Sequence, residues 1–338
     1  MGSMRVVAAP DKLRGTATAG EVAAAIARAA EAHGWTCDQV PLADGGEGTL
    51  EALGGANRTT TVTGPLGQPV AVRWRLDGRT AVIEMAQASG LLLVGGAAGN
   101  DAVAASTAGT GELIAAAIDA GARRIIVGVG GSATTDGGLA ALRALHPLSR
   151  LRGVELLVAC DVRTRFVDAA EVFAPQKGAT PAQVALLRRR LERLAQVYRD
   201  EHGVDVTDLP GAGAAGGLAG GLAAVGARLV PGFDLIADEV DLDSRIEGAD
   251  LVITAEGFLD EQSFEGKVVG GVAELARQAG VRVVAIVGQV FDGVEDRIEA
   301  HSLVERFGEE RAMHDTLACI EAIAREVIAS HGSEGAVQ

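Results

Sequence analysis

Lysine is scarce in this chain of 338 residues, because all but three of its 30 Lys and Arg residues are arginine. The three lysines are Lys12, Lys177 and Lys267, and each lies within three residues of a glycine. An ammonium group is a compact point charge and a guanidinium is a planar fork, so the two are not interchangeable. The scarcity therefore indicates three glycine-rich turns as candidate anion sites, with phosphate as the first candidate.

Aromatic residues and cysteines are also few. Aromatics make up 3% of the chain, whereas its 46 glycines are about twice the usual share. Small and aliphatic residues with many glycines favour closely packed α/β layers joined by tight turns. The three cysteines, Cys37, Cys160 and Cys319, have no metal-binding spacing, so we expect reduced thiols in a cytoplasmic protein.

Positive charge is in deficit, since the formal net charge is −15 and the isoelectric point is near 4.9. Nucleic acids and anionic membranes attract basic surfaces, so we expect neither as a partner. No apolar run approaches the length of a membrane-spanning helix, and no charged-then-apolar leader is evident. None of the six histidines falls in the motifs described below, which disfavours histidine-based nucleophilic catalysis.

Hydrophobic patterning predicts strands that alternate with helices over most of the chain. The segments 59–63, 70–76 and 80–84 instead alternate with tight turns, as antiparallel strands do, so we place a domain boundary near residue 58. The other predicted strands cover 5–9, 38–42, 123–129, 154–161, 249–257 and 281–289. The predicted helices cover 19–33, 47–53, 109–120, 181–201, 267–279 and 314–329, with Thr18 or Thr16, Thr110 and Thr180 as N-caps of the first, third and fourth.

Two glycine-rich motifs follow predicted strands. ADGGEGT at 43–49 carries Asp44 and Glu47, and it is either a Mg²⁺ or hydroxyl site or an ordinary βα turn with a helix-capping acid. GVGGSATTDGG at 128–138 combines several hydroxyls with Asp136 and suits a phosphate or Mg²⁺ cradle better than the dinucleotide fingerprint that it partly matches. A glycine-rich turn without a ligand is the alternative for the second motif.

Charged residues follow two further strands. EGFLDEQSFEGK at 256–267 places Glu256 and Asp260 after a strand and Lys267 at the start of the next helix. APDKLRG at 9–15 places Lys12 and Arg14 after the first strand. Because the carboxyl ends of strands line the ligand crevice of open α/β sheets, both loops are candidate sites. The alternative for each is a solvated, charged loop.

Taken together, these segments resemble the type-1 glycerate kinase family. Nine runs match in family order between residue 5 and about residue 290: APDKLRG, ADGGEGT, GPLGQPV, EMAQASGL, AGTGELI, GVGGSATTDGG, VFAPQKGAT, PGAGAAGGL and GADLVITAEGFLDEQSFEGK. The chain departs from the family at Phe258, where a cation is usual, and at Arg14, where Lys is commoner. It also has a shortened segment at 145–152 and a poorly matched part after Val290.

The resemblance implies an α/β fold with two domains. A flavodoxin-like, doubly wound parallel domain would comprise 4–58 and 246–332, and an inserted α/β domain with a mixed sheet would comprise 59–245. We expect residues 1–3 to be a tag remnant and 333–338 to be a disordered tail.

The resemblance also implies a kinase that uses ATP and Mg²⁺ to phosphorylate D-glycerate, with 2-phosphoglycerate favoured over 3-phosphoglycerate. Catalysis would rest on Asp44, Asp136 and Lys267, and Mg²⁺ would lie on Asp44, Glu47 and Asp136. The nucleotide phosphates would face Gly130, Gly131, Ser132, Thr134 and Thr135. The substrate would contact Lys12, Arg14, Lys177, Glu256 and Asp260.

Other functions stay open at this point. The chain could be a degenerate kinase that only binds a small acid, a kinase of another hydroxy acid, or a nicotinamide dehydrogenase built on Gly128 and Gly130. The dehydrogenase would need Glu155 as its ribose-binding acid. A homodimer is also compatible with the sequence.

Overall fold

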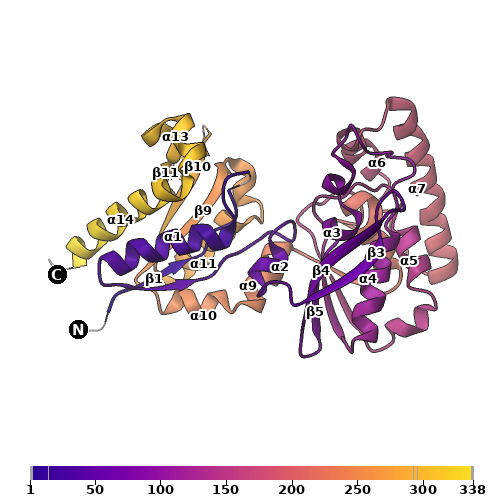
Figure 1. The fold of residues 1–338 in the computed structure, drawn as a ribbon, viewed down its shortest axis with the longest axis horizontal. Coiled ribbons are helices and arrows are strands. Elements are labelled where there is room, and N and C mark those ends of the chain that lie inside the picture. The colour runs from indigo at the N-terminus through magenta and orange to yellow at the C-terminus, as the bar shows by residue number, and fades with distance from the viewer. Residues whose placement is uncertain (1–2, 14, 292, 295, 336–338) are drawn as a thin grey trace. The chain divides into compact units, whose positions relative to one another are not determined.

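The computed structural model of the chain describes residues 3–13, 15–291, 293–294 and 296–335. It has two compact units (Figure 1), and the second is inserted in the sequence of the first. Unit 1 comprises Met1–Asp44, Glu51–Leu53 and Phe233–Gln338, and unit 2 comprises Gly45–Leu50 and Gly54–Gly232. Unit 1 thus resumes earlier in the chain than the predicted return at residue 246.

A five-stranded parallel sheet forms the centre of unit 1. Its strand order is β11-β10-β9-β1-β2, which is 5-4-3-1-2 when the strands of the unit are numbered along the chain. This is the flavodoxin-like order, with the switch point between β1 and β9. The strands are β1 (Arg5–Ala8), β2 (Thr36–Gln39), β9 (Leu251–Leu259), β10 (Arg282–Val290) and β11 (Glu299–Ser302).

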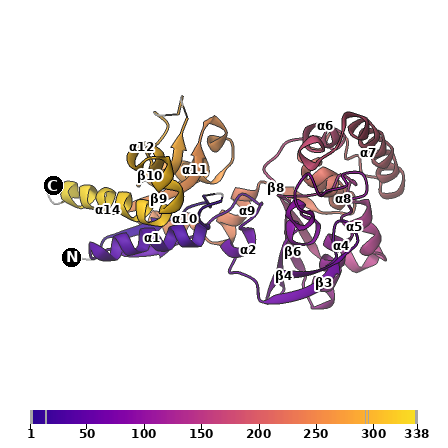
Figure 2. The same ribbon diagram turned by 45° about the horizontal axis from the view of Figure 1, so that its top comes forward.

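Helices cover both faces of this sheet, which confirms the predicted doubly wound domain. Alternate side chains of a strand point to opposite faces. Val6 therefore packs in one core with α1 (Ala19–Ala32) and α14 (Thr316–Gly335), which lie side by side in Figure 2. Val7 packs in the opposite core with α9 (Gly232–Glu239), α10 (Leu242–Glu247) and α11 (Val268–Ala279). The pattern did not predict α9 and α10, which explains the earlier return of the chain to unit 1.

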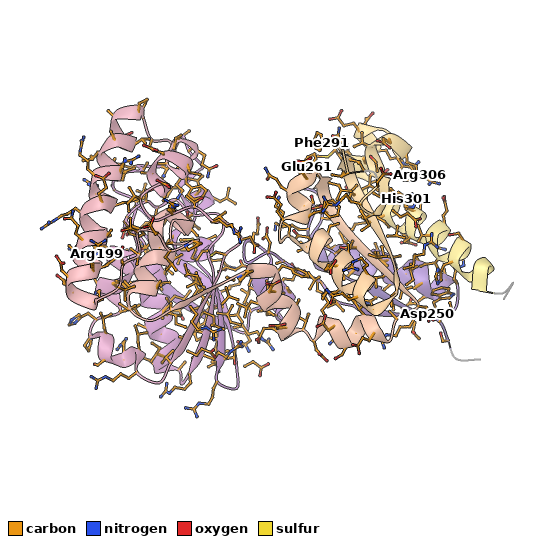
Figure 3. All side chains as sticks on the ribbon, turned by 180° about the vertical axis from the view of Figure 1, so that it is seen from behind. Arg199, Asp250, Glu261, Phe291, His301 and Arg306 are labelled. Atoms are coloured by element: carbon orange, nitrogen blue, oxygen red, sulfur yellow. The ribbon has the colours of Figure 1, made fainter. Side chains whose placement is uncertain are left out.

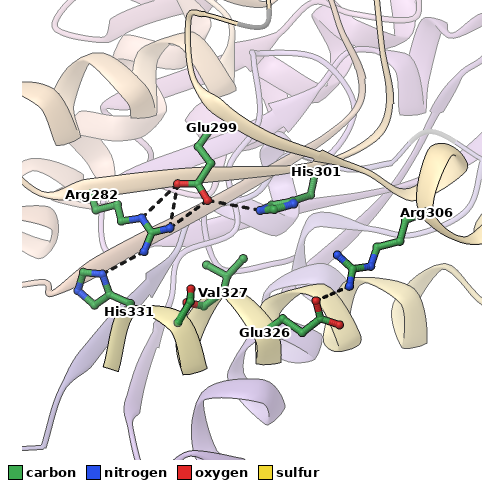
Figure 4. A network of polar contacts seen from close by, with 8 residues as sticks. Arg282, Glu299, His301, Arg306, Glu326, Val327 and His331 are labelled. Atoms are coloured by element: carbon green, nitrogen blue, oxygen red, sulfur yellow. Dashed lines mark hydrogen bonds and ion pairs between the residues drawn. The ribbon is translucent and has the colours of Figure 1, made fainter. Parts of the chain in front are cut away.

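The last helix is fastened to the sheet by a polar network (Figure 4). The Arg282 guanidinium donates to both carboxylate oxygens of Glu299 at 3.0 Å and lies 3.4 Å from Nδ1 of His331. The His331 ring packs edge-on against Trp35, with 5.8 Å between the centroids. Helix α14 extends to Gly335, so 333–335 are helical and not disordered as predicted, whereas 336–338 lie outside the described residues. The preceding short helices are α12 (Leu303–Phe307) and α13 (Glu309–His314).

Unit 2 is built on a mixed six-stranded sheet of order β3-β4-β5-β6-β7-β8. The first three strands pair antiparallel, as the turn pattern predicted, and β5 to β8 pair parallel. The strands are β3 (Arg58–Thr63), β4 (Pro69–Asp77), β5 (Thr80–Glu84), β6 (Arg124–Gly128), β7 (Glu155–Ala159) and β8 (Arg228–Val230). Its helices, with α2 shared between the units, are α2 (Thr49–Ala52), α3 (Ala86–Ser89), α4 (Ala108–Asp119), α5 (Leu139–Ala144), α6 (Ala169–Phe173), α7 (Pro181–His202) and α8 (Leu218–Ala224).

Two of the three predicted helix caps are correct. Thr18 and Thr180 each form a capping box, in which the threonine side chain accepts a hydrogen bond from the backbone three residues on. The prediction for Thr110 is wrong, because α4 begins earlier and Thr107 occupies the cap position. Thr110 lies inside the helix, where its hydroxyl bonds that of Ser89 at 2.8 Å. Within the described part of the chain, no helix is long and apolar enough to cross a membrane.

Candidate functional site

The two glycine-rich motifs meet backbone to backbone in unit 2. A β-carbon on Gly130 would lie 2.7 Å from Cα of Gly46, and one on Gly128 would lie 2.7 Å from the carbonyl oxygen of Gly45. Such distances are shorter than side chains allow, so only glycine fits where the two loops cross. Gly130 is therefore explained by loop packing, whereas Gly131 is exposed and has a φ of +70°.

Glu84, which the sequence reasoning missed, fixes the ADGGEGT loop. It ends β5 and is 7% exposed, and its Oε1 accepts hydrogen bonds from the backbone N–H groups of Gly48 at 3.0 Å and Leu50 at 2.9 Å. Its Oε2 accepts a third from Gln87. A carboxylate that accepts several N–H bonds orders the backbone that supplies them. The run EMAQASGL contained this residue, but nothing in its spacing revealed the partner.

Lys177 is buried beneath the second motif. The side chain is 3% exposed, and Nζ donates to Oγ of Ser132 at 2.8 Å and to the carbonyl oxygen of Thr134 at 2.6 Å. Burial lowers the pKa of this ammonium to about 7, while the nearby Asp136 acts in the opposite direction. In this structure the lysine therefore supports the turn at 132–135, here called the SATT turn, from inside, and it makes its hydrogen bonds to the protein itself.

Asp136 is held at the end of the same turn. Its Oδ2 accepts from the backbone N–H of Thr107 at 2.9 Å and from the Thr107 hydroxyl at 2.8 Å, and Oδ1 accepts from the N–H of Gly138 at 3.1 Å. Burial raises the pKa of the carboxyl, and these hydrogen bonds oppose the rise. Thr107, a second residue that the sequence did not indicate, thus links α4 to the turn.

Two polar atoms near this turn have no partner among the described residues. The hydroxyl of Thr135, a residue that is 1% exposed, has none, and neither has Oδ1 of Asn100. The amide nitrogen of Asn100 donates to the carbonyl oxygens of Ala133 and Lys177. Buried polar atoms nearly always have partners, so unpaired ones indicate places for a ligand or water.

The second group of candidate residues lies at the switch point of unit 1. Asp11 follows β1, and its N–H bonds the carbonyl oxygen of Ala255 in β9 at 2.8 Å. Its carboxylate lies 3.6 Å from Nζ of Lys12. Burial raises the pKa of Asp11 to about 6; Lys12 lowers it and Asp44 raises it further. The electrostatic coupling places Lys12 and Asp44 close to Asp11, a residue that the sequence reasoning left without a role.

Glu256 lies in β9 beside this group. The residue is 8% exposed and its Oε1 has no partner among the described residues. Burial raises the pKa of Glu256 to about 7, while a hydrogen bond from Ser263 and the charge of Lys267 oppose the rise. A carboxyl with a free oxygen and a pKa near neutrality is suited to proton transfer.

The remaining residues of the charged loop differ in their engagement. Asp260 caps a 3₁₀ helix over Glu261–Phe264, where its Oδ1 accepts from the N–H of Ser263 at 3.0 Å. Lys267 is the N-cap residue of α11, and its side chain makes no capping hydrogen bond. Phe258 is 59% exposed and packs on Phe291, which Figure 3 labels, with 5.9 Å between the ring centroids. Arg14 lies outside the described residues.

The described residues hold no group of three or more His, Cys, Asp or Glu side chains that could enclose a metal ion. Glu47 is exposed, and of the predicted metal ligands Asp44 has another carboxylate, Asp11, close to it. Mg²⁺ is commonly held by one or two carboxylates together with substrate phosphates and water, so the pair suits this ion without further protein ligands.

The dehydrogenase alternative required Glu155 as the acid that binds the ribose, and the structure shows this carboxylate already engaged. Glu155 begins β7, and its carboxylate pairs with Arg124 at 3.1 Å and with Arg228 at 3.3 Å. A carboxylate that two guanidinium groups already occupy is poorly placed to receive ribose hydroxyls.

Comparison with known proteins finds a matching family and several similar proteins. The sequence profile of the glycerate kinase family matches residues 6–147 and 145–331. The chain is 40% identical to the Glycerate 2-kinase of Escherichia coli (strain K12) over 86% of its own length and 87% of the relative. It is 40% identical to the Glycerate kinase of Bacillus subtilis (strain 168), with 85% of each chain covered. A crystal structure described as a candidate glycerate kinase 2 from Salmonella typhimurium LT2 matches 99% of the chain and all of that protein with a TM-score of 0.84 and 35% identity.

Proposed function

We propose that this chain, which belongs to the glycerate kinase family, transfers the γ-phosphoryl group of ATP to the 2-hydroxyl group of D-glycerate. Phosphoryl transfer requires of a protein mainly that it position the reactants and stabilise charge. The observation that carries the proposal is the buried Glu256, with its unpaired oxygen, at the switch point beside Asp11 and Lys267. The E. coli relative, whose name specifies the 2-kinase reaction, supports the choice of hydroxyl.

Glu256 acts in this proposal as the general base. Its pKa of about 7 makes it largely ionised at slightly alkaline pH and still basic enough to take a proton. The proton of the attacking hydroxyl passes to Oε1, the oxygen that has no partner within the protein. The Lys267 ammonium has two roles in this proposal. It stabilises the Glu256 carboxylate before proton transfer, and it stabilises the negative phosphoryl oxygens during the transfer of the phosphoryl group.

Asp11 and Asp44 are the residues that would hold Mg²⁺. Burial, and to a smaller extent the charge of Asp44, raises the pKa of Asp11, and a bound cation would relieve the repulsion between the two carboxylates. The ion supplies charge neutralisation for the phosphate oxygens. Lys12 remains available to the carboxylate of glycerate or to phosphate, since its partner Asp11 is then shared with the ion.

The loop of unit 2 contributes by its shape. Lys177 and Asp136 hold the ends of the turn that contains Ser132, Thr134 and Thr135, so that the N–H and hydroxyl groups of this buried turn keep a fixed arrangement. Preorganised donors stabilise phosphate without the cost of ordering them on binding. Both residues therefore act by positioning and not as direct ligands, unlike the roles predicted for them. A cytoplasmic location is part of the proposal, because free cysteines stay reduced there.

The test is a coupled assay of the purified full chain with Mg²⁺, ATP and D-glycerate. 2-Phosphoglycerate feeds enolase directly, whereas 3-phosphoglycerate needs a mutase first, so assays with and without mutase identify the hydroxyl. If ADP release does not increase with glycerate or with any member of a panel of small hydroxy acids, the kinase proposal fails. The degenerate kinase that only binds a small acid is then the remaining hypothesis. A different preferred acid would keep the reaction and change the substrate.

A further inference from the structure

Two phenylalanine side chains are exposed on unit 1, and they contact each other. Phe258 is 59% exposed and Phe291 is 46% exposed, whereas the other five phenylalanines of the chain are buried or half-buried. The two rings are tilted by 39°, with 5.9 Å between their centroids. Single exposed apolar side chains are ordinary on a protein surface, whereas contiguous ones indicate a place where another molecule binds.

Two neighbouring strands hold this pair beside Glu256. Phe258 follows Glu256 by two positions in β9 and is paired with Gln289 of β10. Phe291 directly follows β10, and its backbone N–H donates to the carbonyl oxygen of Leu259 at 2.9 Å. Both rings are therefore carried by the carboxyl ends of two hydrogen-bonded strands, which position side chains more precisely than loops do.

Phe258 and Glu256 belong to the same face of β9, because alternate residues of a strand point to the same side. Val252, two pairs of positions earlier, packs in the core that contains α9, α10 and α11. The charge of Lys267, at the start of α11, acts on Glu256 and agrees with this placement. Residues two apart in a strand are separated by about 7 Å. Phe258 therefore lies within reach of a small acid whose hydroxyl group contacts Glu256.

Charged groups and aromatic rings approach this position from opposite sides of β9. The strand order places β1 on one side of β9 and β10 on the other. Asp11 and Lys12 follow β1, and the N–H of Asp11 bonds the carbonyl oxygen of Ala255. Phe291 follows β10 on the other side. An acid that lies across the end of β9 thus meets charged groups at one end and an apolar surface at the other.

We propose that the pair of Phe258 and Phe291 receives an alkyl substituent of the acceptor acid. The substrate class is then a 2,3-dihydroxy acid that extends glycerate at its third carbon by a short alkyl group. Such a group removes apolar surface of both partners from water, whereas a hydroxymethyl group in its place loses hydrogen bonds to water and gains none from the rings. The proposal rests on the proposed function only for the place of the reacting hydroxyl beside Glu256.

The test compares two acids that differ in one group and have the same configuration as D-glycerate at the second carbon. In 2,3-dihydroxypentanoate a terminal methyl group replaces the terminal hydroxyl of 2,3,4-trihydroxybutanoate. Calorimetric titration of the full-length protein with Mg²⁺ and a non-hydrolysable ATP analogue gives the dissociation constant of each acid without turnover. The wild type should bind the methyl-terminated acid at least about tenfold more tightly, as a methyl group in an apolar site provides.

Substitutions of the pair show whether this preference depends on it. Phe258→Gln should reduce the preference to less than about twofold, and Phe258→Leu, which stays apolar, should keep most of it. Met313→Gln is the matched control and should keep the wild-type preference, since Met313 is 55% exposed in α13 of the same unit and lies in neither strand. Melting temperatures check the fold, and Phe291→Gln repeats the test if Phe258→Gln does not fold.

Three results would overturn the proposal. The first is a wild-type protein that binds the two acids equally well, and the second is a folded Phe258→Gln variant that keeps the wild-type preference. The third comes from analytical ultracentrifugation. If the wild type is a dimer that Phe258→Gln dissociates while the preference between the acids is unchanged, the two rings belong to a subunit interface.

ADP release by the wild type tests the proposed function separately. If neither glycerate nor the two longer acids stimulate release while Phe258 still controls the binding preference, the function fails and the assignment of the pair stands. If release is stimulated and the binding preference is absent or independent of Phe258, the function stands and the assignment of the pair fails.

Discussion

Replacing Lys177 by methionine should remove a pH-dependent part of the stability of unit 2. Burial lowers the pKa of this lysine from its ordinary 10.5 to about 7. Between these two values the unfolded chain binds more protons than the folded chain, so the free energy of unfolding rises with pH. This contribution is complete above the unfolded pKa and is lost as the pH falls to about 7. Methionine keeps the length of the side chain and has no proton to bind.

The size of the effect follows from linkage. One pH unit well inside the window corresponds to about 1.4 kcal/mol. From pH 7.0 to 8.5 the gain is about 1–2 kcal/mol, because the group is only half deprotonated at the start. The measurement stops at pH 8.5 so that cysteine titration does not contribute to the slope. The ordinary thiol pKa is 9.0, and burial raises the pKa of Cys160 to about 11. Methionine also leaves Ser132 and Thr134 without a donor, which lowers stability by about 1–3 kcal/mol at every pH.

The two tryptophans of the chain provide the assay, since Trp35 belongs to unit 1 and Trp74 is buried in unit 2. In a Trp35→Phe background, Trp74 fluorescence reports the urea unfolding of unit 2 at each pH. Arg199→Met, which removes an exposed cation from the same unit, is the control and should keep the wild-type slope. Equal slopes for Lys177→Met and the wild type would refute the buried, neutralised lysine.

Three further substitutions test the site. Asp136→Asn should lower kcat by at least about 10²-fold. It should also lower the melting temperature of unit 2, because the amide nitrogen cannot accept the bonds from Thr107 or Gly138. Near-normal turnover would show that Asp136 does not belong to the site. Glu256→Gln should abolish the rise of kcat/KM with pH through about 7 that ionisation of the wild-type carboxyl produces, and a persisting rise would exclude Glu256 as the base. Lys267→Arg should lower the affinity for ATP or kcat by well over twofold if the lysine ammonium contacts phosphate. Values within about twofold of the wild type would mean that Lys267 is only a solvated residue at the start of α11.

Much of the fold was predictable because its strands are long, apolar and bounded by turns. The segments that became β9 and β10 contain uninterrupted runs of buried residues, and such runs identify central parallel strands. The antiparallel strands β3 to β5 were equally clear from their alternation and tight turns. By contrast, β8 and β11 are three and four residues long and only partly apolar, so the sequence predicted neither.

The candidate site was predictable in its residue types and less so in their tasks. Residue type and position after a strand singled out Lys177 and Asp136, but only the fold shows that their hydrogen bonds go to the protein itself. Glu84 and Thr107 escaped notice because their partners lie far away in the sequence. The Glu84 carboxylate accepts from the backbone of Gly48, 36 positions away, and Thr107 donates to the Asp136 carboxylate, 29 positions away. Glu256 was placed in the site, but its free oxygen depends on packing that no linear pattern contains.

The insertion of unit 2 also determines the order in which the two units can assemble during synthesis. Strand β1 pairs with β9, and the hydroxyl of Thr254 reaches back across 245 residues to the carbonyl oxygen of Ala9. A growing chain therefore completes every segment of unit 2 before the ribosome has made the central strand of unit 1. Until then β1 can pair on one side only, with β2, and its apolar residues lack half of their eventual cover. At this stage of synthesis unit 2 is complete in sequence, whereas the N-terminal segment of unit 1 still lacks the strand that covers it. This exposed segment is the part of the nascent chain that we expect cellular chaperones to bind.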